Sequence, residues 1–305
     1  MENNEYILGI DIGGTSVKIG VVNNGIVLES TSTRNVFKGK SDELVSGIKD
    51  ICNEYIKKYQ IKKIGIGCPG DINDGVVVVA TNLGWKNYHI LKDFESNFPD
   101  LKIVVDNDGK ASCQAEIQYG VLNGVSDGLF VTIGRGVGGV IITNNHQIHG
   151  KYNNGGKIGH MVIQKNGRRC NCGRRGCFES YASAYGLIQT IKEINFHWQN
   201  EEEKIDTEKL SGVQIVNYNK NGSIVVKEGL KRWHKDIAEG ILNLCMIFDP
   251  SVIVIAGGIT DSGLMDLDII KGFLTRRGYD KCELHLAKFK GKTGLVGAAS
   301  LVLMN

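Results

Sequence analysis

The sequence predicts an α/β protein built from two similar domains, and a repeated pattern of strands and turns carries this prediction. Residues 6–28 indicate strand, glycine turn, strand, Asn-Gly turn and strand, because β-branched and apolar residues alternate around these turns. Residues 129–148 repeat this order, with RGVGG as the glycine turn and Asn144-Asn145 as the second turn. Two such units about 120 residues apart indicate an internal duplication.

Helical periodicity between the strands completes the α/β pattern. Residues 41–59 carry one apolar stripe and are expected to form an amphipathic helix with Ser41 as its N-cap. Residues 230–248 carry a second stripe, and Asp249-Pro250 should end that helix. The apolar segments 62–68, 102–107 and 251–258 predict further strands.

Composition describes an ordinary globular chain of 305 residues, with 42% hydrophobic and 23% charged residues and a net charge of +3. That charge gives no strong attraction to nucleic acid or to an anionic membrane. No apolar run reaches the roughly 18 residues that span a bilayer, and the polar start MENNEY has no signal-peptide core, so we expect a cytoplasmic protein. Five cysteines in mainly apolar segments should be buried free thiols: Cys52, Cys68, Cys113, Cys245 and Cys282.

The segment His160–Glu179, HMVIQKNGRRCNCGRRGCFE, predicts a metal site. One imidazole and three thiols at this spacing suit tetrahedral zinc, and two glycines allow the backbone to turn around a small ion. The proposed ligands are His160, Cys170, Cys172 and Cys177.

Two alternatives remain for this segment. It could be a reduced cysteine-rich loop without metal, or a zinc ribbon that binds nucleic acid, although a ribbon usually has two paired-cysteine halves. The four arginines of the segment are expected to form a solvated face instead of a docking patch: Arg168, Arg169, Arg174 and Arg175.

Two glycine turns are candidate phosphate sites. In GIDIGGT at 9–15, Asp11 could hold Mg²⁺ through water while the backbone of Gly13, Gly14 and Thr15 faces an anion, but an ordinary glycine hairpin fits equally well. GRGVGG at 134–139 has dinucleotide-binding spacing, yet it continues into VIIT instead of a helix. A second phosphate-facing hairpin is therefore the better interpretation.

Asp108 follows a predicted strand in VVDNDGK, where a carboxylate could accept a proton from a substrate hydroxyl. The same position suits a helix N-cap, which is the default interpretation until a ligand lies opposite it.

Together these segments resemble the ROK family of sugar kinases and sugar-responsive repressors. The resemblance runs through nearly the whole chain, and the spacing H-x9-C-x-C-G-x2-G-C-x-E is its most specific part. The matching segments are GIDIGGT at 9–15, GCPGDI at 67–72, TNLGW at 81–85, DND at 106–108, TIGRGVGG at 132–139, the segment 160–179 and IVIAGG at 253–258.

The resemblance implies a duplicated actin-like (ribonuclease H-like) fold of two α/β domains that bind ATP and a sugar, without direct contact to nucleic acid or membrane. We expect an N-terminal domain of residues 1–118 with 292–305, and a C-terminal domain of 119–291 with the zinc knuckle 160–179. The family also implies a homodimer. Its repressor branch carries a DNA-binding segment ahead of DxGGT, and only eight residues precede Gly9 here, so we expect no DNA binding of that type.

The resemblance also implies residue roles. Asp108 matches the catalytic base for the sugar 6-hydroxyl, and the zinc is structural, with four protein ligands. Positions matching sugar contacts are Asn82, Asn107, His160 and Glu179. Positions matching the ATP and Mg²⁺ site are Asp11, Gly13, Gly14 and Thr15, then Thr132 to Gly138 including Gly134, Arg135 and Gly136, then Gly257 and Gly258.

Two departures from the family pattern add positive charge. Lys157 stands where E-x-G-H has a sugar-binding glutamate, and an ammonium accepts no hydrogen bonds. Arg135 stands where the second phosphate turn is usually G-T-G or G-S-G, so it could grip phosphate or fill the nucleotide pocket. The chain is therefore expected to be a kinase for a hexose or N-acetylhexosamine, with a sugar recognised by Lys157, or else a catalytically impaired sugar- or nucleotide-binding regulator.

Overall fold

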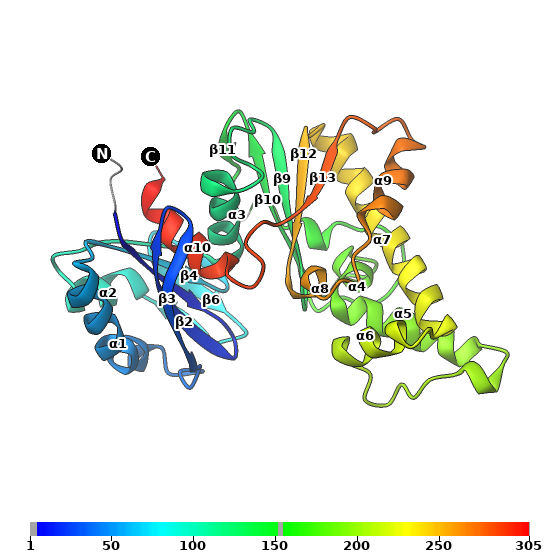
Figure 1. The fold of residues 1–305 in the computed structure, drawn as a ribbon, viewed down its shortest axis with the longest axis horizontal. Helices are drawn as coiled ribbons and strands as arrows, with labels where there is room; N and C mark the ends of the chain where they lie inside the picture. The colour runs from blue at the N-terminus through cyan, green and yellow to red at the C-terminus, as the bar shows by residue number, and fades with distance from the viewer. Residues whose placement is uncertain (1–4, 152–154, 305) are drawn as a thin grey trace. The chain divides into compact units, whose positions relative to one another are not determined.

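The structure, a computed structural model, describes residues 5–151 and 155–304, and the chain divides into two compact units. The first unit comprises the described parts of Met1–Gly124, His149–Gly155 and Ala287–Asn305. The second comprises Val125–Ile148 and Gly156–Leu286. Both units consist of a mixed five-stranded sheet with helices (Figure 1).

The sheet of the first unit has the order β3-β2-β1-β4-β8, with the first three strands antiparallel and β1, β4 and β8 parallel. A smaller antiparallel sheet, β5-β6-β7, follows β4. The strands are β1 Ile7–Ile12, β2 Ser16–Asn23, β3 Ile26–Arg34, β4 Lys63–Cys68, β5 Asp71–Asn73, β6 Val76–Ala80, β7 Trp85–Tyr88 and β8 Lys102–Asn107. The helices are η1 Ser41–Glu43, α1 Leu44–Tyr59, α2 Ile90–Asn97, α3 Asp108–Tyr119, α10 Thr293–Ser300 and η4 Leu301–Leu303.

The sheet of the second unit repeats this plan in the order β11-β10-β9-β12-β13. A hairpin again starts the sheet, and parallel strands again complete it, so the expected duplication is confirmed. The strands are β9 Gly128–Ile133, β10 Val137–Thr143, β11 His146–Gln147, β12 Val252–Ala256 and β13 Glu283–Leu286. The helices are η2 Ile158–His160, α4 Glu179–Ala182, α5 Ala184–His197, η3 Glu201–Glu203, α6 Gly212–Lys220, α7 Ile224–Phe248, α8 Gly258–Asp261 and α9 Leu267–Thr275.

Two glycines let α10 approach the first sheet closely. A Cβ added at Gly65 would lie 1.8 Å from the carbonyl oxygen of Ala298, and one at Gly9 would lie 2.4 Å from that of Leu295. The helix backbone can therefore rest directly on β1 and β4, opposite the apolar face that α1 covers. This packing explains why the last helix of the chain belongs to the first unit.

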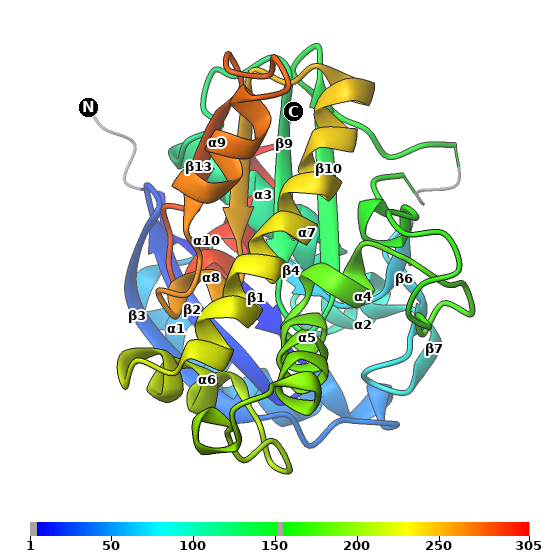
Figure 2. The same ribbon diagram turned by 90° about the vertical axis from the view of Figure 1, so that its right-hand side faces the viewer.

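In the second unit, α5, α7 and α9 pack on one face of the sheet, as Figure 2 shows with α7 and α5 in front of the strands. Trp233 is fully buried on α7, and its indole nitrogen donates to the carbonyl of Ala182 at 2.8 Å. His234 beside it bonds Leu230 O through Nδ1 at 2.7 Å and accepts from the backbone nitrogen of Asp266 through Nε2 at 2.9 Å. A neutral imidazole thus joins α7 to the start of α9.

A buried glutamate explains where the first unit ends. Glu116 on α3 is fully buried, and its carboxylate accepts from the backbone nitrogens of Val121 at 2.9 Å and Lys288 at 2.7 Å. These bonds hold to α3 a residue three positions after the expected boundary at 118 and a residue four positions before the expected boundary at 292. The structure therefore divides the chain at Gly124 and Ala287, and it also assigns His149–Gly155 to the first unit.

Two details of the predicted helices are wrong. Ser41 caps no α-helix: it begins the 3-10 turn η1, and α1 starts at Leu44 without a side-chain cap. The long helix begins at Ile224, six residues before the apolar stripe, because the hydroxyl of Ser223 caps it. The buried face of α1 and the end of α7 at Phe248 agree with the prediction.

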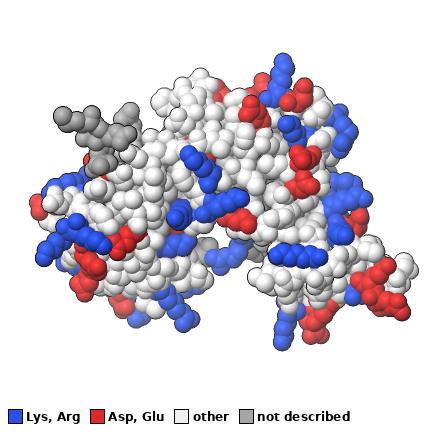
Figure 3. Space-filling view, viewed as in Figure 1, with Lys and Arg blue, Asp and Glu red and all other residues white. Residues whose placement is uncertain are grey.

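All five cysteines expected to be buried free thiols are buried and free. Among the described residues, no helix combines the length and apolar character needed to cross a membrane. On the face drawn in Figure 3, the described basic and acidic side chains are interspersed, as a net charge of +3 would suggest.

Candidate functional site

In the first unit, two carboxylates lie at the same edge of the sheet. Asp11 is the fifth residue of β1, and Asp108 directly follows β8. Because β1, β4 and β8 are parallel, their carboxyl ends meet at one edge, where ligands of α/β proteins commonly bind.

Asp108 is a carboxyl whose proton affinity is raised by its surroundings. Burial is the largest cause and the charge of Asp11 the second, and together they raise the pKa of Asp108 to about 6. The backbone nitrogen of Gly109 donates to its Oδ1 at 2.9 Å and acts in the opposite direction. Above about pH 6 the Asp108 carboxyl is ionised, and its pKa lies close to neutral pH. Both properties suit a general base.

The N-cap of α3 is Asn107, so the interpretation of Asp108 as the cap is wrong. The Asn107 side-chain oxygen accepts from the backbone nitrogens of Gly109 at 2.9 Å and Lys110 at 3.3 Å. Its amide nitrogen donates to the carbonyl of Gly70 at 2.9 Å. The hydrogen-bonding capacity of Asn107 therefore goes largely to the fold, and a hydrogen bond from its side chain also acts to lower the pKa of Asp108.

Asp11 lies against the start of α10. A Cβ added at Gly294 would lie 2.2 Å from its carboxylate, so only glycine fits there. Lys18 on the next strand approaches to 3.9 Å. Burial raises the pKa of Asp11, and the charge of Lys18 partly offsets that effect.

The first glycine turn is held from behind by a buried amide. The turn closes through a bond from Gly13 N to Ser16 O at 2.8 Å, and the side chain of Asn35 donates to Gly13 O at 2.6 Å. Asn35 is only 7% exposed. Gly14 and Thr15 complete the turn, with Thr15 exposed.

Asn82 lies in a small polar recess of about 200 Å³, formed by the loops around β5 and β6. Asn107 bonds Gly70 in the same recess wall, so the recess adjoins the strand end that precedes Asp108. The lining residues are Pro69, Gly70, Asp71, Val79, Ala80, Thr81 and Asn82. Asp71 and Thr81 were given no role from the sequence, although both lie in segments that resemble the family, at 67–72 and 81–85.

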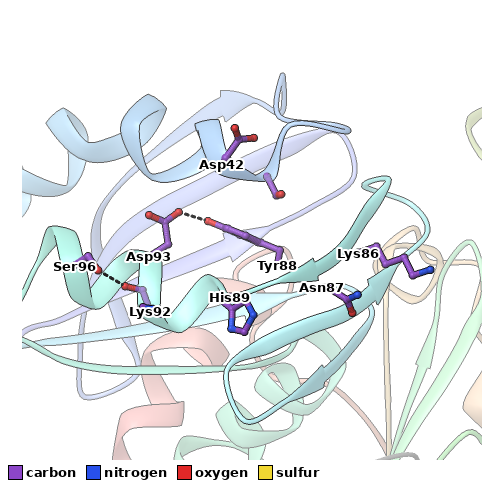
Figure 4. Close-up of a pocket in the computed structure, with 9 residues that line it drawn as sticks. Asp42, Lys86, Asn87, Tyr88, His89, Lys92, Asp93 and Ser96 are labelled. Carbon is purple, nitrogen blue, oxygen red and sulfur yellow. Dashed lines mark hydrogen bonds between the residues drawn. The ribbon is translucent and has the colours of Figure 1, made fainter.

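A larger recess of about 450 Å³ lies beside α2 and β7 (Figure 4). Its polar groups bond partly to one another: Tyr88 donates its hydroxyl hydrogen to Asp93 at 2.5 Å, and the Ser96 hydroxyl donates to Lys92 O at 2.7 Å. None of the predicted site residues lines it.

In the second unit, GRGVGG lies at the expected hairpin: Gly134 to Gly136 form the turn between β9 and β10, and Val137 to Gly139 begin β10. Gly134 N donates to Gly136 O at 2.9 Å and closes the turn, and Arg135 at its tip is exposed. Thr132 faces Gly138 across the hairpin, where a Cβ would lie 2.7 Å from the threonine hydroxyl.

Glu179 links this hairpin to the cysteine segment. Its Oε2 accepts from the backbone nitrogen of Val137 at 3.0 Å, and its Oε1 lies 3.7 Å from the sulfur of Cys170. A Cβ on Gly136 would lie 2.4 Å from Oε2, so glycine is needed for the carboxylate to reach the hairpin.

The four predicted metal ligands converge: their donor atoms all lie within 4.8 Å of one another. The sulfurs of Cys172 and Cys177 are 3.7 Å apart, and Cys170 Sγ is 3.7 Å from His160 Nδ1. Two thiolates on tetrahedral zinc with bonds of about 2.3 Å would lie roughly 3.8 Å apart. The donor set and its spacing thus fit zinc, and Nδ1 of His160 faces the thiols.

The remaining predicted residues also belong to the second unit. Lys157 is exposed and precedes η2, whose Gly159 packs so closely on β10 that a Cβ would lie 2.0 Å from Val137 O. Gly257 has φ 120° and would place a Cβ 2.1 Å from Ile133 O, so this turn lies directly beside the end of β9. A Cβ on Gly258 would meet nothing within 4 Å.

One expectation for the knuckle, defined as residues 160–179, is wrong. Arg169, Arg174 and Arg175 are exposed, but the side chain of Arg168 is only 15% exposed and is fully engaged in the protein. Its partners lie 12 to 25 residues further along the chain, which local sequence patterns do not reveal.

Comparisons with known proteins agree with this geometry. Residues 7–305 match the model of the ROK family. A glucokinase of Halalkalibacterium halodurans is 27% identical, over 98% of this chain and 96% of that protein. A xylose repressor of Caldicellulosiruptor bescii is 26% identical, over 97% of this chain and 78% of that protein. The crystal structure of a ROK family glucokinase from Streptomyces griseus with glucose and AMPPNP is 27% identical, covers 97% of this chain and 98% of that one, and has a TM-score of 0.81.

Proposed function

The chain belongs to the ROK family, and on that premise we propose that it transfers a phosphoryl group from ATP to the 6-hydroxyl of a hexose or N-acetylhexosamine. The placement of Asp108 and Asp11 at the carboxyl edge of one sheet is the observation that carries this proposal, and the raised pKa of Asp108 agrees with it. Asp108 would accept the hydroxyl proton as the sugar oxygen attacks the γ-phosphorus. The similarity to two glucokinases supports a sugar as the acceptor.

We assign the sugar contacts to Asn82, Asn107, Lys157, His160 and Glu179. In the first unit, Asn82 lies in the recess whose wall includes Gly70, and Asn107 donates to the carbonyl of Gly70 beside it. In the second unit, His160, Glu179 and Lys157 would complete the set. Glu179 already accepts from Val137, so it would share its remaining lone pairs with the sugar.

We assign ATP to the two glycine turns and to the turn at Gly257 and Gly258. The first turn comprises Gly13, Gly14 and Thr15, and the second comprises Thr132, Gly134, Arg135 and Gly136. The open space at Gly258 and the exposed guanidinium of Arg135 are compatible with a polyphosphate. Asp11 would hold Mg²⁺ through water, and that ion would neutralise charge on the transferring phosphoryl group.

Zinc would be held by His160, Cys170, Cys172 and Cys177. With four protein ligands it would supply folding energy to the knuckle instead of an open catalytic position. Carefully prepared protein should contain about one zinc per chain, and a content well below that would contradict the assignment.

A second candidate is a sugar- or nucleotide-binding regulator with impaired catalysis. Two exposed cations favour it: Lys157 beside η2 and Arg135 at the tip of the hairpin. The similarity to a xylose repressor is compatible with this candidate as well.

An ATP-consumption screen separates the two candidates. Wild type, Asp108→Asn and Lys157→Glu are tested with hexoses, N-acetylhexosamines and sugar acids. We expect at least one sugar to stimulate ATP turnover, and Asp108→Asn to lose about 10²- to 10⁴-fold of that rate. If no sugar raises turnover above the Asp108→Asn control, the kinase proposal fails. A gain of glucose or N-acetylmannosamine phosphorylation in Lys157→Glu would identify Lys157 as the specificity residue.

Two further properties belong to this proposal. The free cysteines support a reducing compartment, for which we propose the cytoplasm. We also propose a homodimer, which sedimentation of the purified protein would test.

A further inference from the structure

Arg168, at the base of the knuckle, uses its whole guanidinium in hydrogen bonds. Nε and Nη2 donate to the two carboxylate oxygens of Glu193 at 3.1 and 2.8 Å, and Nη2 also donates to Thr190 Oγ1 at 3.0 Å. Nη1 donates to the backbone carbonyls of Ser180 and Gly186, both at 3.2 Å. A guanidinium has five N–H groups, so its donor capacity is saturated.

The rest of Arg168 is tied to the same helices. Its guanidinium carbon lies 4.7 Å from the ring centre of Tyr181, and its backbone nitrogen donates to the Tyr181 hydroxyl at 2.7 Å. This combination of paired charge, ring stacking and bidentate bonding is specific to arginine, because lysine offers neither a planar group nor five donors.

The segment that Arg168 holds carries Glu179. Helix α4, Glu179–Ala182, has four residues, and a helix of a single turn does not form by itself in water. On one side Glu179 bonds Val137 in the hairpin, and on the other Arg168 bonds Ser180 and stacks on Tyr181. The direction of the Glu179 carboxylate therefore depends on contacts outside α4.

We propose that Arg168 is a positioning residue: it clamps α4 and α5 to the base of the knuckle and thereby aims Glu179 at the sugar. The inference rests on the proposed function insofar as Glu179 binds sugar. The clamp itself consists of contacts within the protein, and none of its atoms belongs to the proposed metal ligands. Loss of the clamp should therefore affect sugar binding while zinc stays bound.

The matched test compares Arg168→Lys with Arg175→Lys. Arg175 is an exposed arginine of the same knuckle with one bond, from Nη1 to Gly167 O at 3.3 Å, so this control removes a guanidinium without touching the clamp. Glu193→Gln is the milder second variant, because it weakens the bidentate pair and leaves the bonds to Ser180, Gly186 and Thr190.

We expect Arg168→Lys to raise the KM for sugar by about tenfold, with kcat and the KM for ATP changed by less than about twofold. Glu193→Gln should raise the KM for sugar by a smaller factor, and Arg175→Lys should leave the KM for sugar unchanged. Zinc content should stay equal in all variants. Amide hydrogen exchange at residues 179–184 should accelerate in Arg168→Lys relative to Arg175→Lys.

Other results overturn the inference. A lower melting temperature with unchanged sugar KM and unchanged exchange at residues 179–184 would reduce Arg168 to general stabilisation. If Arg168→Lys fails to fold, an unchanged sugar KM in Glu193→Gln would likewise reduce Arg168 to general stabilisation. If wild type phosphorylates no sugar, the proposed function fails, and the exchange measurement still decides whether Arg168 holds α4.

Discussion

Replacing Asp108 by asparagine should make the protein more stable at neutral pH while it removes most of the proposed activity. The side chain of Asp108 is half-buried, and partial loss of solvent together with the charge of Asp11 disfavours its ionised form in the folded state. The amide has nearly the same shape, and its oxygen can still accept from Gly109 N, which lies 2.9 Å from Oδ1. The substitution thus removes an unfavourable charge and keeps the local hydrogen bond.

The magnitude follows from the pKa of Asp108, which is raised from 3.8 to about 6. That difference corresponds to about 3 kcal/mol of unfolding free energy, as an upper bound. Between these pH values the folded state keeps the proton and the unfolded state releases it, so this group lowers stability as pH rises. The advantage of asparagine should therefore be absent below pH 3.8, grow up to about pH 6 and stay constant above it.

Urea unfolding of wild type and Asp108→Asn at several pH values from about 4 to 8 measures this difference directly. Asp106→Asn is the matched control, two residues earlier on the same strand end. The Asp106 carboxylate accepts from Asn107 N at 2.7 Å and lies 3.7 Å from Lys110 Nζ, so its loss should cost stability by about 1 kcal/mol. The activity of wild type should also fall below about pH 6, as Asp108 becomes protonated.

The reasoning is refuted if Asp108→Asn is no more stable than wild type at pH 7.5, or if its advantage is the same at pH 4 as at pH 7.5. The first result would mean that water or a neighbouring donor solvates the carboxylate in the folded state. The second would mean that the gain comes from packing and not from charge.

Two further predictions concern the second unit. Gly136→Ala should lower the free energy of unfolding by about 1–3 kcal/mol in a urea titration, because its Cβ would lie 2.4 Å from Glu179 Oε2. The control Gly134→Ala should leave that free energy nearly unchanged, because its Cβ would meet nothing within 4 Å. An equal loss in both variants would count against this steric account. Burial lowers the pKa of His234 below 6.5, so the folded protein should lose stability as pH falls below 6.5, by at most about 1.4 kcal/mol per pH unit. His234→Gln should flatten the dependence of the unfolding free energy on pH between 6.5 and 5, and the exposed control His146→Gln should not. If wild type and His234→Gln show the same slope, His234 is excluded as the cause.

The sequence predicts those parts of the molecule that depend on neighbours in the chain. Alternating strands around glycine turns gave both hairpins, and the spacing of His160 to Cys177 gave a cluster whose donor atoms lie within 4.8 Å. Both are contained in one short segment of the chain: each hairpin turns within a few residues, and the four ligands lie between residues 160 and 177 in a recognisable spacing.

Features that depend on distant partners could not be predicted in this way. Glu116 lies in an ordinary helical pattern, yet its carboxylate binds the backbone of Lys288, 172 residues later, and so sets where the first unit ends. Arg168 looks like one of four basic surface residues, and only the return of α4 and α5 supplies its partners. Ser41 has the chemistry of an N-cap, but the chain enters α1 through a 3-10 turn instead. In each case tertiary packing overrides the local preference.

The two glycine turns show how duplicated topology can receive different chemistry. Each closes with a bond from its first glycine nitrogen, Gly13 N to Ser16 O at 2.8 Å and Gly134 N to Gly136 O at 2.9 Å.

Their supports differ in polarity. Asn35 donates to a carbonyl of the first turn, whereas Glu179 accepts from Val137 N behind the second. The first support leaves backbone N–H groups available to an anion, and the second uses one of them and brings a carboxylate close to the turn. An anion near the second turn therefore needs extra positive charge, and the exposed Arg135 at its tip supplies it. On this reasoning we propose that Arg135 compensates for the charge of Glu179 and supports nucleotide binding instead of filling the nucleotide pocket.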